Sequence, residues 1–479
     1  MIARFSRCLA SAAIFALVVA STLTAPAAAA GQFRRAEAPV KPSVVKVPGD
    51  LSGHWMMRLD PADKGLVERW FEKTLPVDLI KVVRLPGSLT EAGMGDDVTV
   101  DTKWTGGIVD KSWFTAPEYA PYRKPGSIKV PFWLNPTKHY VGPAWYQREI
   151  SVPKSWKGRR ILLTLERVHW ETKVWVDGNE AGTCDSLSTP HDYDLTRLGL
   201  PGRHRLLIRV DNRIKEIDVG ENAHSVSDHT QTNWNGIVGR ITLAAGSALY
   251  IDEVRVDPDV PGRKARVTVA LVNATGRVHT GNMVLTASRP NAPGTAPVAP
   301  LYVRFSAAEG RSETSVDYPL GPDAALWDEF SPSVYALTVS VRGLVAAIQD
   351  DKTIRFGLRE FKAQGTRFLV NGRPVFLRGT LECCIFPKTG YPPMTQDEWW
   401  RICQVAKAHG LNHIRFHSWC PPEAAFDAAD EAGIYLYVEC PLWAEIGDGK
   451  PIDAWLYKES ERIVKAYGNH PSFCMMSYG

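Results

Sequence analysis

Short runs in which apolar and polar residues alternate fill the first half of the chain and predict β-strands. Residues 161–165 and 205–210 are compact apolar runs, and residues 173–176 alternate before the pair Asp177 and Gly178. Asp and Gly tolerate the positive φ angles of a two-residue turn, so this pair predicts a hairpin. Short strands without a helical period indicate a jelly-roll-like β-sandwich from residue 51 to residue 250.

A second β region follows over residues 251–356. Its strand-like runs are 266–272 and 334–341, and a loop rich in Pro, Ala and Gly occupies residues 290–300 between them. About 100 residues of this kind are typical of an immunoglobulin-like sandwich. We therefore expect two successive β-domains.

From Gly357 onwards the pattern changes to strands that alternate with helices. Residues 375–379 predict a first strand. Thr395, followed three residues later by Glu398, is a capping box that predicts the start of a helix, and Gly410 supplies a left-handed stop.

The alternation continues to the last residues of the chain. The predicted elements are a strand over 412–416, a helix over 422–432, a strand over 434–438, a helix over 453–467 and a strand over 473–477. The near-continuous apolar run of the third strand suits a parallel sheet covered on both faces. The expected fold class is thus multidomain β plus α/β. Its last part, residues 357–479, would be the first half of a TIM barrel with four βα units.

The N-terminus has the features of a secretory signal peptide. Arg4 and Arg7 precede a mostly apolar stretch over residues 9–20, which small residues follow. We predict a signal peptide over residues 1–30, a linker over residues 31–50, and export to the periplasm or the exterior. An uncleaved anchor is the alternative.

Charge and cysteine content exclude several classes of partner. The chain carries a formal charge of +4, which falls to +2 without the two arginines of the predicted signal peptide. This balance, without blocks of like charge, argues against nucleic acid. No later segment has 18 consecutive apolar residues, so no stable membrane span is expected after cleavage. The cysteine spacing fits neither a zinc site nor a small disulfide scaffold, which favours buried thiols, with a single disulfide in an exported protein as the alternative. A homo-oligomer is compatible with these observations.

Three sequence motifs, together with the order of the domains, indicate a protein family. Residues 142–148 have the sequence GPAWYQR, residues 368–379 FLVNGRPVFLRG, and residues 469–472 NHPS. With two sandwiches followed by a βα barrel, they resemble glycoside hydrolase family 2, which includes β-galactosidases, β-glucuronidases and β-mannosidases. The resemblance covers essentially the whole chain after the predicted signal peptide.

The resemblance implies a retaining glycosidase, which uses two carboxylates about 5 Å apart. One protonates the leaving oxygen and the other attacks the anomeric carbon. The family places the acid/base after the fourth barrel strand and the nucleophile after the seventh. Both glutamates are therefore expected beyond Gly479, and the chain as given is expected to be inactive. We assign no catalytic residue within it.

Two carboxylates within the chain lie at predicted strand ends, on the rim where barrel active sites form. Glu382 follows the first strand and Glu439 ends the third. Strands one and three contribute to the same layers of a barrel, so the two side chains could be neighbours. Each is a candidate for binding substrate hydroxyls or for orienting neighbouring groups through hydrogen bonds. A catalytic role for either is the remaining alternative.

The end of the second strand carries Arg415, His417 and Trp419. Arg and His beside an aromatic ring suit sugar hydroxyls or a carboxylate. Arg415 matches the family pattern, whereas Ser418 stands where the family usually has His, and His417 stands where it usually has Ser. The alternatives are an internal ion pair for Arg415, a structural histidine, and a core position for Trp419.

Two further candidates come from the resemblance. After the third strand, β-galactosidase-like sequences offer a Glu and a His to a divalent metal, and these positions fall on Trp443 and Glu445. Because Trp cannot ligate a metal, we expect no family-type magnesium site and no cofactor. Trp443 is instead a candidate wall of the sugar subsite. In the sandwich, Asn235 is a candidate for a sugar hydroxyl, with a tight-turn role as the alternative.

The resemblance therefore implies a retaining exo-β-glycosidase that acts on terminal β-linked sugars of an oligosaccharide or glycoside. A β-galactoside is the first expectation. A β-glucuronide is the alternative, because Arg415 and His417 could hold a carboxylate. A non-catalytic carbohydrate-binding protein is the alternative from another functional class.

Overall fold

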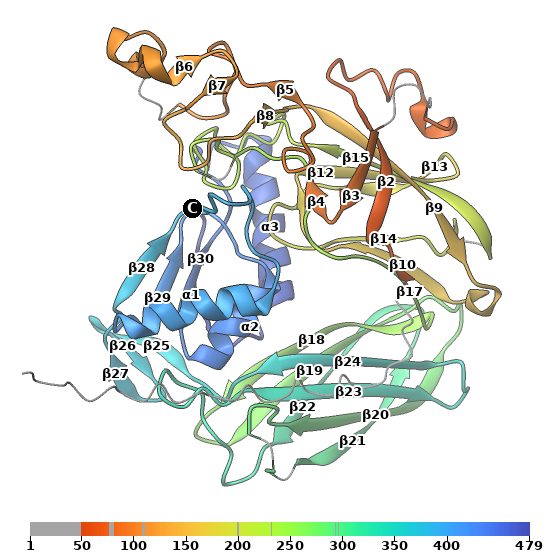
Figure 1. The fold of residues 1–479 in the computed structure, drawn as a ribbon. Helices are drawn as coiled ribbons and strands as arrows, with labels where there is room; N and C mark the ends of the chain where they lie inside the picture. Colours follow the sequence, from red (N-terminus) through yellow and green to blue (C-terminus); the bar gives the residue numbers. More distant parts are fainter. Residues whose placement is uncertain are drawn as a thin grey trace, which may run out of the picture. The chain divides into compact units, whose positions relative to one another are not determined.

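The computed structural model describes residues 49–75, 81–107, 111–198, 201–230, 232–292, 294–295 and 297–479. The predicted signal peptide, and the predicted linker up to residue 48, lie outside these ranges. No helix within them combines the length and the apolar character that a membrane crossing requires. Figure 1 shows the elements coloured along the sequence.

Antiparallel sheets form the first region, as its alternating pattern predicts (Figure 1). The largest has the order β13-β12-β15-β9-β2-β3, with β2 Gly53–Leu59, β3 Lys81–Leu85, β9 Pro143–Val152, β12 Glu171–Val176, β13 Asn179–Cys184 and β15 Gly202–Asp211. A second has the order β1-β17-β10-β14, with β1 Gly49–Asp50, β10 Arg160–Leu165, β14 His191–Asp194 and β17 Ile241–Gly246. A small third sheet joins β4 (Gly87–Ser88), β11 (Val168–His169) and β16 (Gly236–Ile237). The predicted hairpin is confirmed, since Asp177 and Gly178 have φ angles of 50° and 86° between β12 and β13.

The two larger sheets share one apolar core. Tyr146, Val174 and Ile208 of the six-stranded sheet belong to the same buried cluster as Leu163 and Leu243 of the four-stranded sheet. Burying a large apolar side chain contributes about 1.5–3 kcal/mol each. The alternating pattern thus stabilises two facing layers.

A long insertion between β4 and β9 has little regular structure. Its elements are β5 (Asp96–Asp97), η3 (Lys111–Phe114), η4 (Pro117–Tyr122), β6 (Arg123–Lys124), β7 (Ser127–Ile128) and β8 (Lys138–His139). Short 3-10 helices elsewhere are η1 (Trp70–Glu72) and η5 (Lys154–Trp156). Trp113, Val130 and Phe132 form a small core within the insertion.

The second β region also consists of antiparallel sheets. One has the order β18-β19-β22, with β18 Leu249–Asp259, β19 Lys264–Asn273 and β22 Gly310–Pro319. The other has the order β21-β20-β23-β24, with β20 His279–Ser288, β21 Val298–Ala307, β23 Tyr335–Gly343 and β24 Gln349–Phe356. Val267, Leu285 and Val339 contribute to their common buried cluster.

The predicted parallel β/α part is confirmed. Its strands are β28 (Gly379–Glu382), β29 (His413–Phe416), β30 (Tyr435–Glu439) and β31 (Phe473–Ser477), paired in this order. The helices between them are α1 (Gln396–Ala408), α2 (Glu423–Ala432) and α3 (Pro451–Tyr467). The prediction of a first strand over 375–379 is wrong. β27 (Arg373–Val375) closes a small antiparallel sheet with β25 (Phe361–Gln364) and β26 (Arg367–Val370), and the first parallel strand starts at Gly379.

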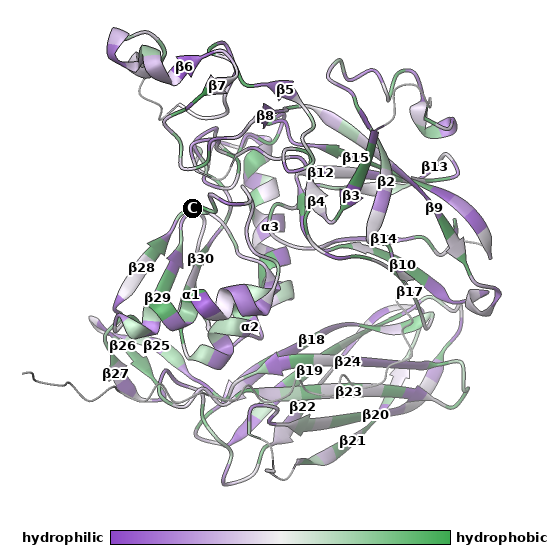
Figure 2. Ribbon diagram, viewed as in Figure 1, coloured by the Kyte–Doolittle hydropathy of each residue, from purple (hydrophilic) through white to green (hydrophobic). Residues whose placement is uncertain are grey.

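The helix boundaries follow local signals. Thr395 is the N-cap of α1, and its hydroxyl donates to the Glu398 carboxylate at 2.5 Å. Gly433 ends α2 at a φ of 71°, a conformation that favours glycine. Along α1, Trp399 and Cys403 are buried while Arg401 and Gln404 are exposed, and Figure 2 shows both apolar and polar residues on this helix.

Side chains tie the sandwich to the parallel sheet. Arg167, buried in the sandwich, donates to the Ser188 carbonyl at 2.6 Å and to the Cys420 carbonyl at 2.8 Å. Glu459 of α3 is fully buried and accepts the Ser186 hydroxyl at 3.0 Å. Sandwich loops therefore lie directly against the C-terminal ends of the parallel strands.

Candidate functional site

A buried ion cluster joins the ends of β29 and β30. The Glu439 side chain has no exposed surface and lies at the last position of β30. Arg415 Nε donates to Glu439 Oε1 at 2.6 Å, and His417 Nδ1 donates to Glu439 Oε2 at 2.8 Å. The parallel register pairs Arg415 with Tyr437, so the two strand ends meet at one edge. The structure thus brings together three of the residues predicted from the sequence.

The cluster is oriented towards solvent through its two basic members. The Arg415 side chain is 42% exposed and that of His417 is 22% exposed, whereas the carboxylate beneath them is enclosed. A carboxylate in this environment needs such partners, because desolvation of an unpaired charge is expensive. Glu439 therefore fixes the two side chains, and both of them keep surface that is exposed to solvent.

Glu382, at the end of β28, has its carboxylate bound to its own loop. Its oxygens accept the backbone N–H groups of Cys384 at 3.1 Å and Ile385 at 3.3 Å. Its carbonyl accepts the N–H of His417 at 2.9 Å and the Trp419 indole at 3.3 Å. Burial raises the pKa of the Glu382 carboxyl to about 7, so near neutral pH it exists in both protonation states. These contacts fit a group that orients its neighbours.

The two tryptophans proposed for a sugar subsite have different environments. Trp419 is 1% exposed and packs against Trp399 and Phe416 in the core, which corresponds to the core alternative. Trp443 is 51% exposed, and its ring centroid lies 5.3 Å from that of His417. Of the two, Trp443 is the one that presents an aromatic surface beside the ion cluster.

Asn235 is buried inside the sandwich, and its side chain binds other sandwich residues. It is 1% exposed, accepts the Tyr146 hydroxyl at 3.0 Å, and donates to the carbonyls of Gly142 at 3.0 Å and Val210 at 3.1 Å. Both amide N–H groups and the carbonyl oxygen thus have protein partners. These hydrogen bonds join Asn235 to sandwich segments far away in the sequence, so its side chain cross-links the sandwich.

His224 is a site residue that the sequence analysis did not identify. It lies in the sandwich loop after β15, and its Nδ1 donates to the His417 carbonyl at 2.6 Å. Its ring also contacts the rings of His417, at 4.9 Å, and Trp443, at 5.8 Å. Burial lowers the pKa of His224, which favours the neutral ring. The signal in the sequence was the cluster of His224, Asp228 and His229 in one loop.

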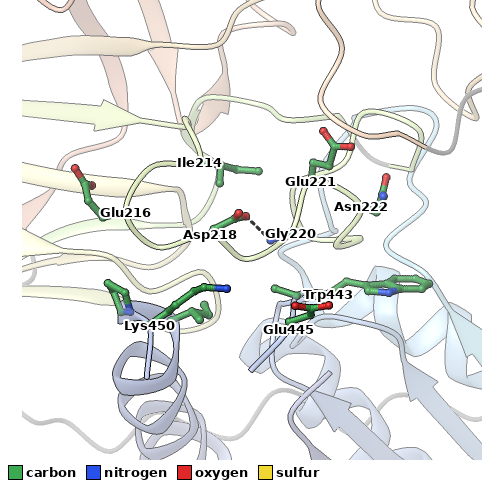
Figure 3. Close-up of a pocket in the computed structure, with 12 residues that line it drawn as sticks. Ile214, Glu216, Asp218, Gly220, Glu221, Asn222, Trp443, Glu445 and Lys450 are labelled. Atoms are coloured by element: carbon green, nitrogen blue, oxygen red, sulfur yellow. Dashed lines mark hydrogen bonds between the residues drawn. The ribbon is translucent and has the colours of Figure 1, made fainter. Parts of the chain in front are cut away.

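A cavity of about 610 Å³ begins beside Trp443. Its walls are the sandwich loop after β15 and the loop between β30 and α3 (Figure 3). The polar and aromatic side chains that line it are Glu216, Asp218, Glu221, Asn222, Trp443, Glu445 and Lys450.

Two places hold residues that bear on metal ligation. Trp443 and Glu445, the positions of the family's metal ligands, lie on the rim of this cavity, and an indole offers no ligand atom. Ligand atoms of Asp427, Asp430 and His470 lie within 4.8 Å of one another. His470 Nδ1 donates to Asp430 at 2.6 Å, and an Asp427 oxygen lies 3.4 Å from the Arg355 guanidinium, so we assign no metal.

Comparison with known proteins places this geometry in a family. Residues 49–246 match the family profile described as glycosyl hydrolases family 2, sugar binding domain. The β-glucuronidase of Paenibacillus borealis is 24% identical over 349 residues, which cover 69% of this chain and 48% of that protein. The β-galactosidase of Thermoanaerobacter pseudethanolicus is 25% identical, with coverage of 70% of this chain and 44% of that protein.

Among solved structures, a Bacteroides uniformis β-glucuronidase superposes with a TM-score of 0.70 at 18% identity. The superposition covers 90% of this chain and 47% of that structure. The chain thus spans about half, or less, of the length of these proteins, and the structural match extends through the sandwiches and the parallel sheet. The chain thus carries the sugar binding domain of glycosyl hydrolases family 2, and over most of its length it is similar to β-galactosidases and β-glucuronidases.

Proposed function

We propose that this chain carries the substrate-binding part of a retaining exo-β-glycosidase that acts on terminal β-linked sugars. The supporting observation is the ion cluster, in which Glu439 holds Arg415 and His417 at the ends of adjacent parallel strands. In a βα barrel this edge forms the active site, and we propose that β28 to β31 belong to such a barrel. Export through residues 1–30 is part of the proposal.

The charge of the cluster favours a neutral sugar. Glu439 already compensates the Arg415 guanidinium, and both of its oxygens are occupied. A sugar carboxylate would therefore find no uncompensated positive charge there, although exposed N–H groups remain for hydroxyls. We propose a β-galactoside as the substrate and a β-glucuronide as the alternative. The named relatives include both activities at similar identity.

The described carboxylates at the rim are assigned to binding and not to bond cleavage. Retention needs two carboxylates about 5 Å apart that are free to reach the anomeric centre. Glu439 is enclosed by Arg415 and His417, and Glu382 is held by two backbone N–H groups. We propose that they orient the sugar-binding groups while glutamates of later barrel strands supply the acid/base and the nucleophile.

Equilibrium binding of non-hydrolysable ligands tests the proposal. Phenyl β-thiogalactoside and phenyl β-thioglucuronide would be titrated into the 479-residue polypeptide in a calorimeter. We expect the galactoside to bind at least about tenfold more tightly, a difference of about 1.4 kcal/mol. The matched control is Asp323→Asn, which removes an exposed carboxylate from the second β region and should change neither affinity. Tighter binding of the glucuronide would contradict the neutral-sugar proposal.

Turnover provides the second test. The same polypeptide should not release p-nitrophenol from p-nitrophenyl β-galactoside, because neither described rim carboxylate is free to attack. Measurable hydrolysis that Glu382→Gln or Glu439→Gln abolishes would overturn their assignment to binding.

A further inference from the structure

The cavity beside Trp443 lies outside the ion cluster but adjoins it. Trp443 contacts the His417 ring at 5.3 Å and also lines the cavity. A sugar bound at the cluster would therefore have its neighbouring unit close to the cavity mouth. The volume of about 610 Å³ is within the range of small-molecule binding sites.

The two walls of the cavity are held together by backbone contacts. The Trp443 N–H donates to the Val219 carbonyl at 2.7 Å, which joins the barrel-side loop to the sandwich loop. At Gly220 the two chain segments are so close that a β-carbon would lie 2.0 Å from the Trp443 carbonyl oxygen. The cavity is thus formed by a defined junction, as a preorganised binding site requires.

The lining is acidic. Glu216, Asp218, Glu221 and Glu445 provide four carboxylates against the single ammonium group of Lys450. That ammonium group is itself paired with Asp448 at 2.5 Å. The whole chain, by contrast, has a net charge of +4, so the acidic character is local. In Figure 3 the Asp218 and Glu445 carboxylates lie between the two loops, with the Trp443 ring at one end.

These carboxylates have capacity for a ligand. Among the described residues, no hydrogen bond or ion pair occupies the side chains of Glu216, Glu221 or Glu445, and Asp218 accepts only the N–H of Gly220 at 2.9 Å. Carboxylates accept hydrogen bonds from hydroxyl and ammonium groups but repel other carboxylates. An exposed aromatic ring at the mouth adds an apolar surface, which suits the face of a pyranose.

We propose that this cavity is the subsite for the leaving-group side of the substrate and that it takes a neutral or amino sugar and rejects a uronic acid. The inference rests on the proposed glycosidase function, since that function places the cleaved sugar at the ion cluster. It adds the charge class of the second sugar unit. The Asp218 and Glu445 carboxylates accept its hydroxyl or ammonium hydrogens while Trp443 covers its apolar face.

The test uses three β-1,4-linked trimers that share a neutral galactose at the non-reducing end and differ in the charge of the other two units, which are glucosamine, glucose or glucuronate and give each trimer its name here. Each would be titrated into the 479-residue polypeptide at about 20 mM and at about 500 mM salt. At low salt we expect the glucosamine trimer to bind about tenfold more tightly than the glucose trimer, and the glucuronate trimer to bind most weakly. At high salt the difference should shrink to about twofold, because exposed charges are screened.

Two variants test whether the cavity carboxylates cause the preference for the glucosamine trimer. Asp218→Asn and Glu445→Gln should each reduce the preference for the glucosamine trimer by about threefold. Asp323→Asn, which removes an exposed charge elsewhere, should leave the preference intact. Equal affinity for all three trimers, or tighter binding of the glucuronate trimer, would overturn the proposal. A preference for the glucosamine trimer that neither Asp218→Asn nor Glu445→Gln reduces would also overturn the proposal.

The two proposals fail in different ways. If the glycosidase proposal is wrong and the cavity proposal right, the trimers keep their charge order but the thiogalactoside does not bind. If only the cavity proposal is wrong, the thiogalactoside binds as expected and the trimers show no dependence on Asp218 or Glu445.

Discussion

Gly220 of the sandwich loop lies in van der Waals contact with the Trp443 backbone of the barrel-side loop. Its φ angle is 84°, and the Val219 carbonyl next to it accepts the Trp443 N–H at 2.7 Å. This contact holds an aromatic side chain of one region against a loop of another. The position of Trp443 therefore depends on the absence of a side chain at Gly220.

Gly220→Ala should separate the two loops. The new methyl group meets backbone atoms, which cannot move away without breaking the hydrogen bond. Gly276→Ala is the matched control, because Gly276 has a φ of 77° and a β-carbon added there would meet no atom within 4 Å. We expect the control to lose about 1–2 kcal/mol from backbone strain and Gly220→Ala to lose roughly 1–3 kcal/mol more. Urea unfolding followed by fluorescence measures both values. An equal loss of unfolding free energy in Gly220→Ala and Gly276→Ala would show that the loop contact leaves room for a side chain at Gly220.

Arg415→Met should destabilise the protein by leaving Glu439 buried without its guanidinium. We expect a loss of about 2–4 kcal/mol in the free energy of unfolding, lower than for a fully enclosed pair because Arg415 is 42% exposed. Adding Glu439→Gln should recover part of this loss, since the buried charge is then removed as well. The double-mutant cycle measures the coupling, expected at about 1–3 kcal/mol. A coupling of zero would contradict the ion cluster.

Trp443→Ala should mainly weaken ligand binding, whereas Trp419→Ala should mainly reduce the stability of the fold. Trp443 is half exposed, so its loss should change stability by no more than about 0.5 kcal/mol. Its loss should also weaken binding of the glucosamine trimer by roughly tenfold, or about 1.4 kcal/mol. Trp419 is 1% exposed, so its replacement should cost about 3–5 kcal/mol of stability. Calorimetric titration and thermal unfolding of the two variants provide the measurements. A large stability loss for Trp443→Ala would argue against its role as an exposed wall.

Stability should decrease as Glu382 ionises. Burial raises the pKa of this carboxyl from 4.5 to about 7 in the folded state, so between these values the unfolded chain releases the proton more readily. The contribution of the protonated carboxyl to the free energy of unfolding is complete below pH 4.5 and is lost as the pH rises towards 7. Above that pH, ionisation of Glu382 no longer changes the free energy of unfolding. Glu382→Gln should remove this loss, which urea unfolding at a series of pH values would measure.

Asp427→Asn, measured by urea unfolding over the same pH values, provides a comparison with Glu382→Gln. Burial raises the pKa of Asp427 to about 6, so its contribution should be lost in a lower window that ends near pH 6. His169 acts in the opposite direction, because burial lowers its pKa to about 4 and stability is lost as the pH falls from 6.5. If the free energy of unfolding changed with pH in the same way in Glu382→Gln as in the unsubstituted protein, the raised pKa of Glu382 would be contradicted.

Several elements of the fold follow from local chemistry and could be predicted from the chain alone. The turn at Asp177 and Gly178, the helix stop at Gly433 and the last strand, Phe473–Ser477, lie where the pattern predicted. The turn and the helix stop depend on positive φ angles that Asp and Gly tolerate, and the last strand is a short apolar run that follows a helix. The rim positions of Arg415 and Glu439 followed in the same way, because side chains at the ends of consecutive parallel strands meet at one edge.

The first parallel strand shows where local patterns were insufficient. Residues 375–379 are apolar enough for a strand, but the chain bends between β27 and β28, and pairing with β29 begins at Gly379. Strand pairing depends on the partner strand, so the apolar run alone did not determine the boundary.

Packing between distant segments determined which candidates face a ligand. Trp419 and Trp443 are the same residue type near consecutive strand ends, yet one is packed in the core and the other is half exposed. The Asn235 side chain is bound by two sandwich segments, at residues 142–146 and at Val210, whereas His224 reaches His417 across 193 positions of sequence. The cavity likewise forms where the loop at Gly220 meets the loop at Trp443. Such contacts join segments far apart in the chain, and no period or turn signal within either segment encodes them.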